Sequence, residues 1–492
     1  MRATISVSPR LNGARIFGCR PRSPVHITLA AAGIGPLHFE ADPLPKGLRL
    51  DARTGFLSGR ITTPGRHVFN VRVSGPGGEA AAETVIVCGA RLALTPPMGW
   101  SSWNCWGLHV TGEHVLTSAR SMAELLRPHG WTYVNIDDAW QGERARTGDH
   151  ALQANEKFPD MAGLVAAVHA LGLRAGIYSS PWATTYAGYH GDSSDHPQGR
   201  LPARNDMANW WQRRAHLFNG KGLHSFTAAD ARQYAKWGFD YLKYDWFPID
   251  GPATRACAAA LADTGRDIVL SLSNTLDRST LPDVIGHAQL WRTTNDLHDV
   301  WSLNTGTPYG FQGVRDIIRW HDAFQPFQSP GAWNDPDMLV LGHVGLGSGL
   351  HPTRLTPIEQ TTHFALWCLW SAPLLIGCPL DQLDPFTLGL LTNDELISVN
   401  QDPCGVQAWR ILEKNDCVIY RKPLVDGTSV YGLLNLGEKP REVRLDWKTA
   451  ELPAATHSVR DLIARRPLGP HRRGITLEVP AHGIAVLHPT LA

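Results

Sequence analysis

Residues 239–250 read FDYLKYDWFPID and place Lys243 and Asp245 two positions apart, at the end of a run typical of a buried β-strand. Side chains two residues apart lie on the same face of a strand. Both groups are therefore predicted to point the same way, with the lysine charge lowering the pKa of Asp245. A carboxylate that stays ionised in this way can act as a nucleophile.

Other carboxylates also close predicted strands. A single aspartate at such a place is commonly the N-cap of the next helix. Unpaired buried carboxylates destabilise a core, so several of them together require a ligand, a cation or a metal to balance their charge. Six carboxylates at four strand ends are too many to be explained as caps. Besides Asp245, they are Asp137, Asp138, Asp296, Asp335 and Asp337.

The elements that must position these residues alternate between strands and helices from about residue 92. Amphipathic helices are predicted over 112–127, 160–171 and 228–237, among others. This alternation predicts a (β/α)8 barrel, in which active sites lie at the carboxyl ends of the strands. A doubly wound sheet is less consistent, because no G-x-G-x-x-G or Walker-type loop follows the first strand. The eight predicted strands are 96–103, 132–138, 174–180, 240–246, 268–274, 290–296, 332–338 and 373–379.

The two ends of the chain have a different pattern, with short alternating runs separated by proline, glycine and turn residues. This pattern predicts a β-sandwich at each end of the barrel. We therefore expect three domains: a β-sandwich over 1–90, a catalytic (β/α)8 barrel over 91–403, and an antiparallel β domain over 404–492.

Three chemistries suit an acidic, tryptophan-rich barrel mouth. The first is a metal site, but none of the 22 histidines ends a predicted strand and no His-x-His motif occurs. The second is sugar binding without catalysis, since the faces of the 18 tryptophans could stack on sugar rings. The third is glycoside hydrolysis, in which Asp245 attacks the anomeric carbon and Asp296 protonates the leaving oxygen. Asp296 then needs a dry or negative setting to stay protonated, and no metal or cofactor is required.

The composition disfavours several other classes of protein. The net charge is +1, and no dense Lys/Arg tract with interleaved aromatics occurs, so no nucleic-acid partner is expected. No apolar stretch is long enough for a transmembrane helix, so no membrane partner is expected either. The eight cysteines show no CxxC or zinc-like spacing. Cys19 and Cys88 flank the first domain, and the sequence leaves open whether they form a disulfide.

Long motifs from about residue 92 to the C-terminus resemble glycoside hydrolase family 27, the family of α-galactosidases and α-N-acetylgalactosaminidases. The resemblance implies a retaining mechanism, with Asp245 of the K-Y-D motif as nucleophile and Asp296, closing W-R-T-T-x-D, as acid/base. The implied substrate is a terminal α-galactoside of an oligo- or polysaccharide. In order, the motifs are LTPPMGWSSWNCWG, YVNIDDAWQ, GIYSS, YLKYDWF, WRTTND, WNDPDMLVLG, LTPIEQTTHFALWCLWSAPLLIGC and LLTNDELISVNQDP.

The resemblance also implies a set of sugar contacts. Asp137 and Asp138 would accept hydrogen bonds from the axial O4 and from O6 of galactose. In the family, loss of the first of these two goes with β-L-arabinopyranosidase activity, so Asp137 favours a sugar with a C6 hydroxyl. The residues matching the family's sugar contacts are Trp103, Asp137, Asp138, Tyr178, Lys243 and Arg292, with Asp337 and Met338 on the strand-7 wall.

The sequence departs from the family pattern around the mouth. Ala139 replaces the cysteine of D-D-C-W, and Trp246 and Phe247 replace Asn-Cys after the nucleophile. The usual disulfide is therefore absent. Four aromatic residues are expected to shape the mouth instead: Trp182, Tyr186, Tyr189 and Trp246. Plant-type α-galactosidases have Cys-Glu-Trp where this chain has Ser-Asn-Thr at 273–275, so an α-N-acetylgalactosaminide, a β-L-arabinopyranoside or an α-glucan stays open as substrate. The residues expected to form a further subsite are Trp182, Trp246 and Asn274.

Residues 44–74 resemble immunoglobulin-like modules that precede catalytic domains in many bacterial glycosidases. We expect this module to be a spacer or docking unit without a ligand of its own. Such modules often occur on exported enzymes, which favours a periplasmic or extracellular location. The first 20 residues, however, lack the apolar core of a signal peptide.

Overall fold

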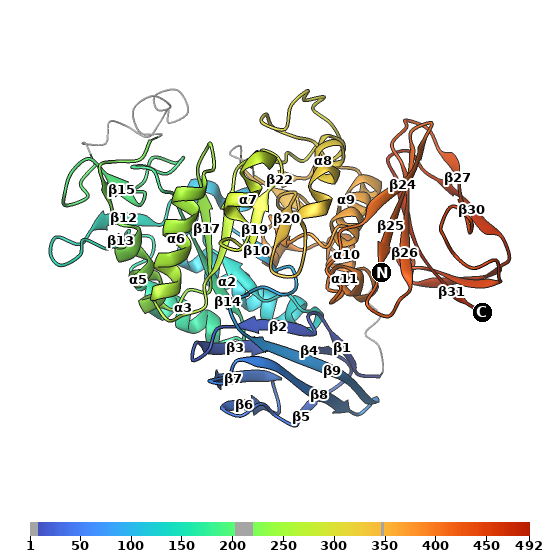
Figure 1. The fold of residues 1–492 in the computed structure, drawn as a ribbon, viewed down its shortest axis with the longest axis horizontal. Helices are drawn as coiled ribbons and strands as arrows, with labels where there is room; N and C mark the ends of the chain where they lie inside the picture. The colour runs from blue at the N-terminus through green and yellow to red at the C-terminus, as the bar shows by residue number, and fades with distance from the viewer. Residues whose placement is uncertain (1–7, 202–219, 346–348) are drawn as a thin grey trace.

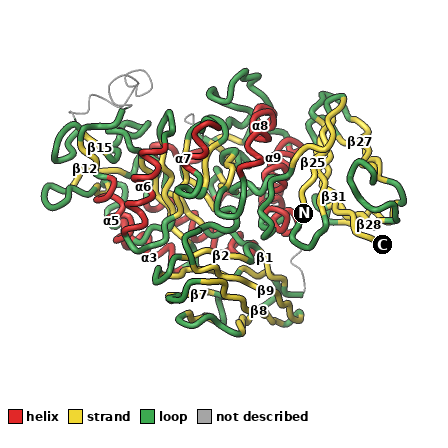
Figure 2. Tube along the Cα trace, in the orientation of Figure 1, coloured by secondary structure: helices red, strands yellow, loops and turns green. Residues whose placement is uncertain are grey.

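The computed structural model describes residues 8–201, 220–345 and 349–492. Figure 1 shows β-sheets from the N-terminal part of the chain below a central barrel, and C-terminal β-sheets at one side of it. Figure 2 shows that the helices are concentrated in the central part, around the barrel strands. The chain therefore has the order of fold types that its sequence pattern predicts.

The N-terminal strands form two sheets around a core that includes Leu57, Phe69, Val71 and Ile86. Their pairing is antiparallel, except that β2 and β9 run parallel to each other. One sheet contains β2 (Ile16–Cys19), β9 (Gly78–Cys88), β8 (Gly65–Gly75) and β5 (His38–Asp42). The other contains β3 (Pro24–Thr28), β7 (Phe56–Arg60) and β6 (Leu48–Asp51), and β1 (Arg10–Asn12) pairs with β4 (Ala30–Ala32).

This sandwich-like unit aligns Cys19 and Cys88 as neighbours in the β2–β9 register. Both cysteines are buried free thiols in this structure. The immunoglobulin-like character of the unit and the three domain limits stay predictions.

The N-terminal sheets are tied to the end of the barrel at which its strands begin. Arg20 Nε donates to Asp267 Oδ1 over 2.8 Å. His26 and Thr28 contact carbonyl oxygens at 2.8 and 2.5 Å in the loop that precedes the third barrel strand. These contacts favour a docked unit over a loose spacer, and they lie at the opposite end of the barrel from the predicted active site.

Arg20→Ala is expected to lower the free energy of unfolding by about 1 kcal/mol, because it removes a partly buried charged hydrogen bond between the two units. Activity should not change. Thermal unfolding at a fixed protein concentration measures the effect. The matched control is Arg72→Ala, whose partner Glu40 is 3.8 Å away at the exposed surface. Equal shifts in both variants would argue against a docking role for Arg20.

All eight predicted barrel strands are present and form one parallel sheet. Beyond β20, Leu339 forms a parallel bridge with Ile376 of β23, which brings the two ends of the sheet together. In sheet order the strands are β20 (Trp333–Asp335), β19 (Leu290–Arg292), β18 (Val269–Ser273), β17 (Tyr241–Asp245), β14 (Arg174–Ser179), β11 (Tyr133–Asn135), β10 (Met98–Ser101) and β23 (Leu374–Ile376).

The three helices predicted above are α2 (Gly112–Ser121), α3 (Met161–Ala170) and α5 (Thr227–Trp237). The first is shorter than expected. Its hydrogen-bond pattern changes to a π-turn over Met122–Leu126, and Pro128, which has no N–H to donate, lies in the 3-10 turn that follows. The other α-helices in the described residues are α1 (Trp103–Trp106), α6 (Gly251–Asp263), α7 (Leu281–Val284), α8 (Val314–His321), α9 (Pro357–Leu369), α10 (Pro385–Leu391) and α11 (Asp394–Asn400).

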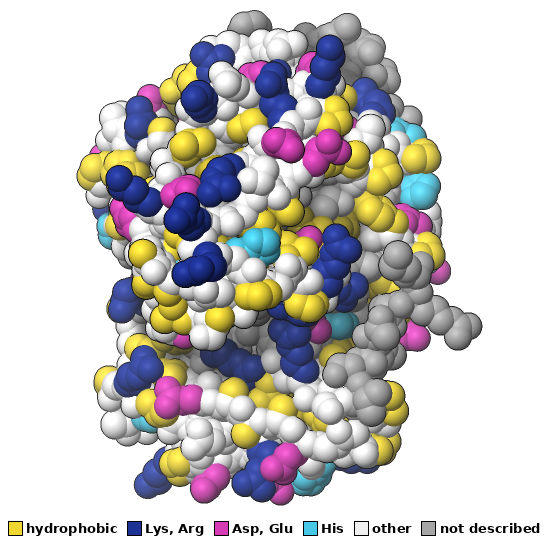
Figure 3. Space-filling view, turned by 90° about the vertical axis from the view of Figure 1, so that its right-hand side faces the viewer, with side chains coloured by type: hydrophobic (Ala, Val, Ile, Leu, Met, Phe, Trp, Pro, Cys, Tyr) yellow, Lys and Arg dark blue, Asp and Glu magenta, His cyan; other side chains and the backbone are white. Residues whose placement is uncertain are grey.

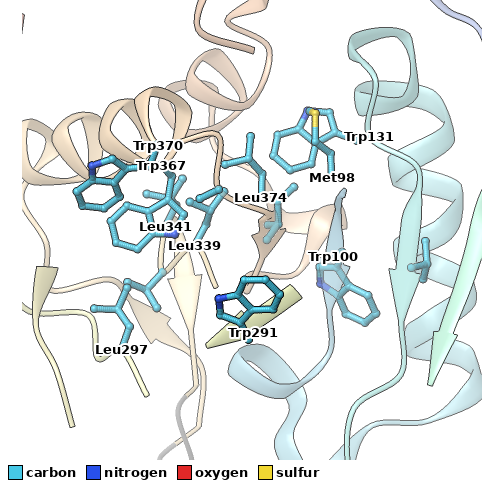
Figure 4. Packing of buried hydrophobic residues seen from close by; sticks show 14 of the residues in the cluster. Met98, Trp100, Trp131, Trp291, Leu297, Leu339, Leu341, Trp367, Trp370 and Leu374 are labelled. Atoms are coloured by element: carbon cyan, nitrogen blue, oxygen red, sulfur yellow. The ribbon is translucent and has the colours of Figure 1, made fainter. Parts of the chain in front are cut away.

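Most of the tryptophans belong to the core. Figure 4 shows Trp100, Trp291, Trp367 and Trp370 among buried leucines of the barrel and α9. The abundance of tryptophan therefore reflects a large core more than a sugar-stacking surface. No helix in the described ranges is long and apolar enough to cross a membrane.

The C-terminal strands form a six-stranded and a two-stranded sheet with a core of their own. Figure 3 shows the molecule from this side, with lysine and arginine side chains spread among acidic and hydrophobic ones. The short alternating runs predicted in this part of the chain form eight strands. The large sheet has β24 (Trp409–Lys414), β25 (Cys417–Pro423), β26 (Ser429–Asn435), β31 (Ile484–Leu491), β28 (His457–Asp461) and β29 (Arg466–His471). The small one pairs β27 (Arg441–Asp446) with β30 (Gly474–Val479).

Candidate active site

A cavity lies at the carboxyl ends of the barrel strands. Most of the sequence-predicted charged residues meet there, because successive parallel strands end at one rim. The cavity is lined by Asp137, Lys243, Arg292, Asp335, Asp337 and Met338, together with Ser101, Asn135, Ile136, Tyr241, Ser271, Ser273 and Leu375. Of the six predicted carboxylates, Asp137, Asp335 and Asp337 line the cavity, whereas Asp138, Asp245 and Asp296 are not among its lining residues.

Asp245 is the last residue of β17 and is only 9% exposed. Its Oδ2 accepts a hydrogen bond of 2.9 Å from the Tyr178 hydroxyl, and its Oδ1 lies 3.5 Å from Asn274 Nδ2. Burial raises the pKa of Asp245 to about 7. The Lys243 charge opposes this shift, and the negative charge of Asp296 adds to it.

The predicted role of Lys243 is therefore only partly right. Its charge lowers the pKa of Asp245 as expected, but burial outweighs it. Its hydrogen bond goes elsewhere, because Lys243 Nζ donates to Asp137 Oδ2 over 2.9 Å. The same oxygen accepts a hydrogen bond of 2.9 Å from Ser101 Oγ. Burial also acts against the Lys243 charge, but the carboxylates of Asp137 and Asp245 outweigh it and raise the pKa of Lys243.

Asp296 lies four residues beyond Arg292, the last residue of β19. Its side chain is 51% exposed, so the first of the two alternative settings, a dry one, is not found. The second alternative, a negative setting, is present. The carboxyl groups of Asp245 and Asp337 are close enough to Asp296 for its charge to raise the pKa of both. Arg292 Nη2 lies 3.3 Å from Asp296 Oδ1, and Arg292 Nη1 lies 2.9 Å from Asp337 Oδ1. The exposed carboxyl of Asp296 is accessible to water, while Arg292 and Asp337 are buried beneath it.

Asp337 is held from several sides. Its Oδ2 accepts from the Leu297 backbone N–H over 2.7 Å, and its own N–H donates to Asp335 Oδ1 over 2.8 Å. Burial raises the pKa of Asp337, although the Arg292 guanidinium opposes the shift. These bonds connect the end of β20 to the loop that carries Asp296.

The loop after β14 is fastened by backbone hydrogen bonds in place of the family's disulfide. Asp138 Oδ2 accepts from the Ala187 N–H over 2.9 Å, and Asp138 Oδ1 accepts from the Ala139 N–H over 2.7 Å. Burial raises the pKa of Asp138 to about 6, although these hydrogen bonds favour its ionised form. All eight cysteines are free thiols, so the mouth is not cross-linked.

The predicted subsite residues behave differently from one another. The prediction of Trp246 as a subsite residue is wrong. Trp246 is only 1% exposed, lies in the hydrophobic core, and donates from Nε1 to Asp250. Trp182 is also buried, and its ring lies 5.1 Å from that of Tyr186. Asn274 does face the site, with Nδ2 2.7 Å from the Tyr186 hydroxyl and close to Asp245.

Trp103 begins α1 directly after Ser102, whose Oγ accepts from the Asp137 N–H over 3.0 Å. Ser101 is a site residue whose role the sequence did not assign. It ends β10, as Asn135, Ser273, Arg292 and Asp335 end their own strands, and this position was the available signal. Tyr186 was expected among the aromatic residues of the mouth, but its contact with Asn274 was not predicted, because it depends on the path of the loop. Among the described residues, no group of three or more His, Cys, Asp or Glu side chains is arranged to hold a metal ion.

Comparison with known proteins agrees with this geometry. The family profile "Alpha galactosidase A" matches residues 95–210 and 212–402, and "Alpha galactosidase C-terminal beta sandwich domain" matches 414–488. The chain is 31% identical to Alpha-galactosidase A of Cellvibrio japonicus (strain Ueda107) over 425 residues, covering 81% of this chain and 92% of that one. It is 30% identical to Alpha-N-acetylgalactosaminidase of Gallus gallus over 366 residues, covering 69% and 78%.

A crystal structure from Bacteroides fragilis NCTC 9343 resembles the whole chain. That protein is provisionally assigned as an α-galactosidase/melibiase. It superposes with a TM-score of 0.85 at 30% identity, covering 99% of each chain. The similarity therefore extends over the N-terminal sheets as well as the barrel.

Proposed function

The chain belongs to the α-galactosidase family, glycoside hydrolase family 27, and from this premise we propose that it releases terminal α-linked galactose with retention of configuration. Membership makes the chain a glycoside hydrolase similar to α-galactosidases. The observation that supports the finer proposal is the contrast between two carboxyl groups that interact. Asp245 is buried and bonded by Tyr178, whereas Asp296 is exposed to solvent.

In the proposed first step, an Asp245 oxygen attacks the anomeric carbon and forms a glycosyl ester. Asp296 gives its proton to the leaving oxygen as the glycosidic bond breaks. The Tyr178 hydroxyl and the Asn274 amide each lie beside one oxygen of Asp245 and hold the carboxylate in place. The charges of Lys243, Asp137 and Asp296 act on Asp245 and further restrict the orientation of its carboxyl group.

In the second step, Asp296 accepts a proton from water, which attacks the anomeric carbon and releases Asp245. The exposure of Asp296 suits this role, because both the leaving group and the incoming water must reach it. Covalent retention requires the carboxyl groups of Asp245 and Asp296 to be about 5–6 Å apart, which stays a prediction. The reaction requires no cofactor.

Two features around the proposed nucleophile favour galactose. Lys243 fixes Asp137 as an acceptor for sugar hydroxyls, and Asp138 lies next to it. Asn274, backed by Tyr186, stands beside the nucleophile, where it can bond a 2-hydroxyl and leaves less room for a 2-acetamido group. An α-N-acetylgalactosaminide is the second candidate substrate, because one relative is an α-N-acetylgalactosaminidase.

A panel of nitrophenyl glycosides tests the substrate directly. The expected result is that kcat/KM for the α-galactoside exceeds that for the α-N-acetylgalactosaminide, the β-L-arabinopyranoside and the α-glucoside. A preference for one of the other three would overturn galactose specificity, and no turnover of any would favour a sugar-binding protein.

The pH dependence follows from the burial of Asp245. Asp245 attacks only when ionised, so kcat/KM is expected to fall as the pH drops through a pKa raised to about 7. The negative charge of Asp296 contributes to that rise. Asp296→Asn is therefore expected to move this acid limb to lower pH. α-Galactosyl fluoride is the substrate to use, because fluoride leaves without protonation. A limb that stays in place or moves to higher pH would contradict the assigned coupling.

A further inference from the structure

Two partly exposed aromatic rings lie next to each other where barrel strands leave the sheet. Phe247 follows the proposed nucleophile by two residues, and its ring centroid is 5.9 Å from that of Tyr309 at an interplanar angle of 63°. Each of these residues is 43% exposed. The reaction described above uses neither of them, and Phe247 stands where relatives have a disulfide cysteine.

Tyr309 is fixed to the segment that carries Asp296. The preceding residue, Asn295, donates from Nδ2 to the Tyr309 carbonyl over 2.6 Å and from its backbone N–H to the Pro308 carbonyl over 2.8 Å. The Tyr309 hydroxyl donates to Asp277 Oδ2 over 3.0 Å, which sets the direction of the ring. The aromatic pair is therefore held on the side of the mouth where the proposed acid lies.

We propose that Phe247 and Tyr309 form a binding subsite for the first sugar of the leaving group. This inference rests on the proposed function, since Asp296 must protonate the oxygen that joins the two sugars. The leaving group then lies on the Asp296 side, where the two rings are. An exposed aromatic face packs well against the apolar C–H face of a pyranose. Rings already held in place lose little conformational freedom when the sugar binds.

The test compares two substrates with the same galactosyl group. α-Galactosyl-1,6-glucose has a leaving pyranose, whereas α-galactosyl fluoride has none. Phe247→Ala is expected to lower kcat/KM for the disaccharide by about tenfold and to leave that for the fluoride within about twofold. Tyr309→Ala should show the same selective loss. Phe386→Ala is the matched control, because Phe386 is 39% exposed on α10, away from the aromatic pair.

A loss of equal size on both substrates, or no loss on the disaccharide, would overturn the subsite. Failure of the galactose assignment has a different signature, because the unmodified enzyme would then turn over neither substrate. In that event the same comparison uses the disaccharide and the fluoride of the sugar that the nitrophenyl panel selects. The ratio of kcat/KM for the disaccharide to kcat/KM for the fluoride therefore tests the role of the aromatic pair, whichever sugar the enzyme cleaves.

Discussion

Asp245→Ala is expected to lower kcat by about 10⁴-fold or more, even for α-galactosyl fluoride. The variant has no group that can form the glycosyl ester, and a good leaving group does not replace the missing nucleophile. Initial-rate measurements with the fluoride and with a nitrophenyl α-galactoside check the expected loss. Activity within about tenfold of the unmodified enzyme would remove Asp245 from the mechanism.

Azide provides a chemical control for this variant. A small anion can enter the space left by the carboxylate and attack from the same face, so Asp245→Ala with azide should yield β-galactosyl azide. The product's configuration, read by NMR, identifies the face that Asp245 occupies. Formation of the α-azide would place the nucleophile elsewhere.

Asp245→Asn separates folding from catalysis. Burial raises the pKa of Asp245 to about 7, so the cost in stability grows as the pH rises above the unfolded pKa of about 3.9 and is complete above the folded pKa. The cost is small at pH 4, where the group is protonated in the folded protein and about half protonated in the unfolded chain. The variant should therefore raise Tm at pH 8 and change it little at pH 4, while remaining inactive. A lower Tm at pH 8 would mean that the hydrogen bonds outweigh the burial penalty.

Asp296→Ala is expected to discriminate between leaving groups. Loss of a general acid typically costs about 10²–10⁴-fold in rate. We expect a loss of this size in kcat/KM for α-galactosyl-1,6-glucose and a much smaller one for the fluoride, which needs no proton. Steady-state kinetics on the two substrates measure the difference. Equal losses would argue that Asp296 only shapes the site.

The same variant tests the second step. Without Asp296 no group activates water, so the glycosyl ester should accumulate on activated substrates and appear as a burst of fluoride release. Azide needs no base, so it should shorten the lifetime of the ester and give α-galactosyl azide, opposite in configuration to the product of Asp245→Ala. Asp299→Ala is a control that removes a nearby carboxylate bound to Arg354; it should show no such burst.

The fold could be predicted in large part because its signals are local. Each of the eight barrel strands is a short apolar segment, and several residues at their ends line one cavity by the geometry of a parallel barrel. The same logic could have placed Trp246 correctly. Residues 243 and 245 point inward, so period-two alternation puts 246 on the outer face, where it is buried.

Other features depend on burial, charge and contacts between distant residues, which the spacing of residues along the sequence does not reveal. The pKa of Asp245 reflects burial against the charges of Lys243 and Asp296, and the sequence indicated only the lysine. The exposure of Asp296 depends on the long segment between β19 and α8, which has few periodic signals. The parallel β2–β9 pair joins residues about 70 positions apart, which local patterns do not detect.

Trapping the covalent intermediate tests the proposed mechanism most directly. A fluorinated galactosyl fluoride that reacts quickly but is hydrolysed slowly is incubated with the enzyme, and the peptides are analysed by mass spectrometry. We expect one fluorinated galactosyl group per chain, attached to Asp245. A sugar on a different carboxylate, or continued turnover in which no ester forms and the anomeric configuration is inverted, would contradict the proposed mechanism.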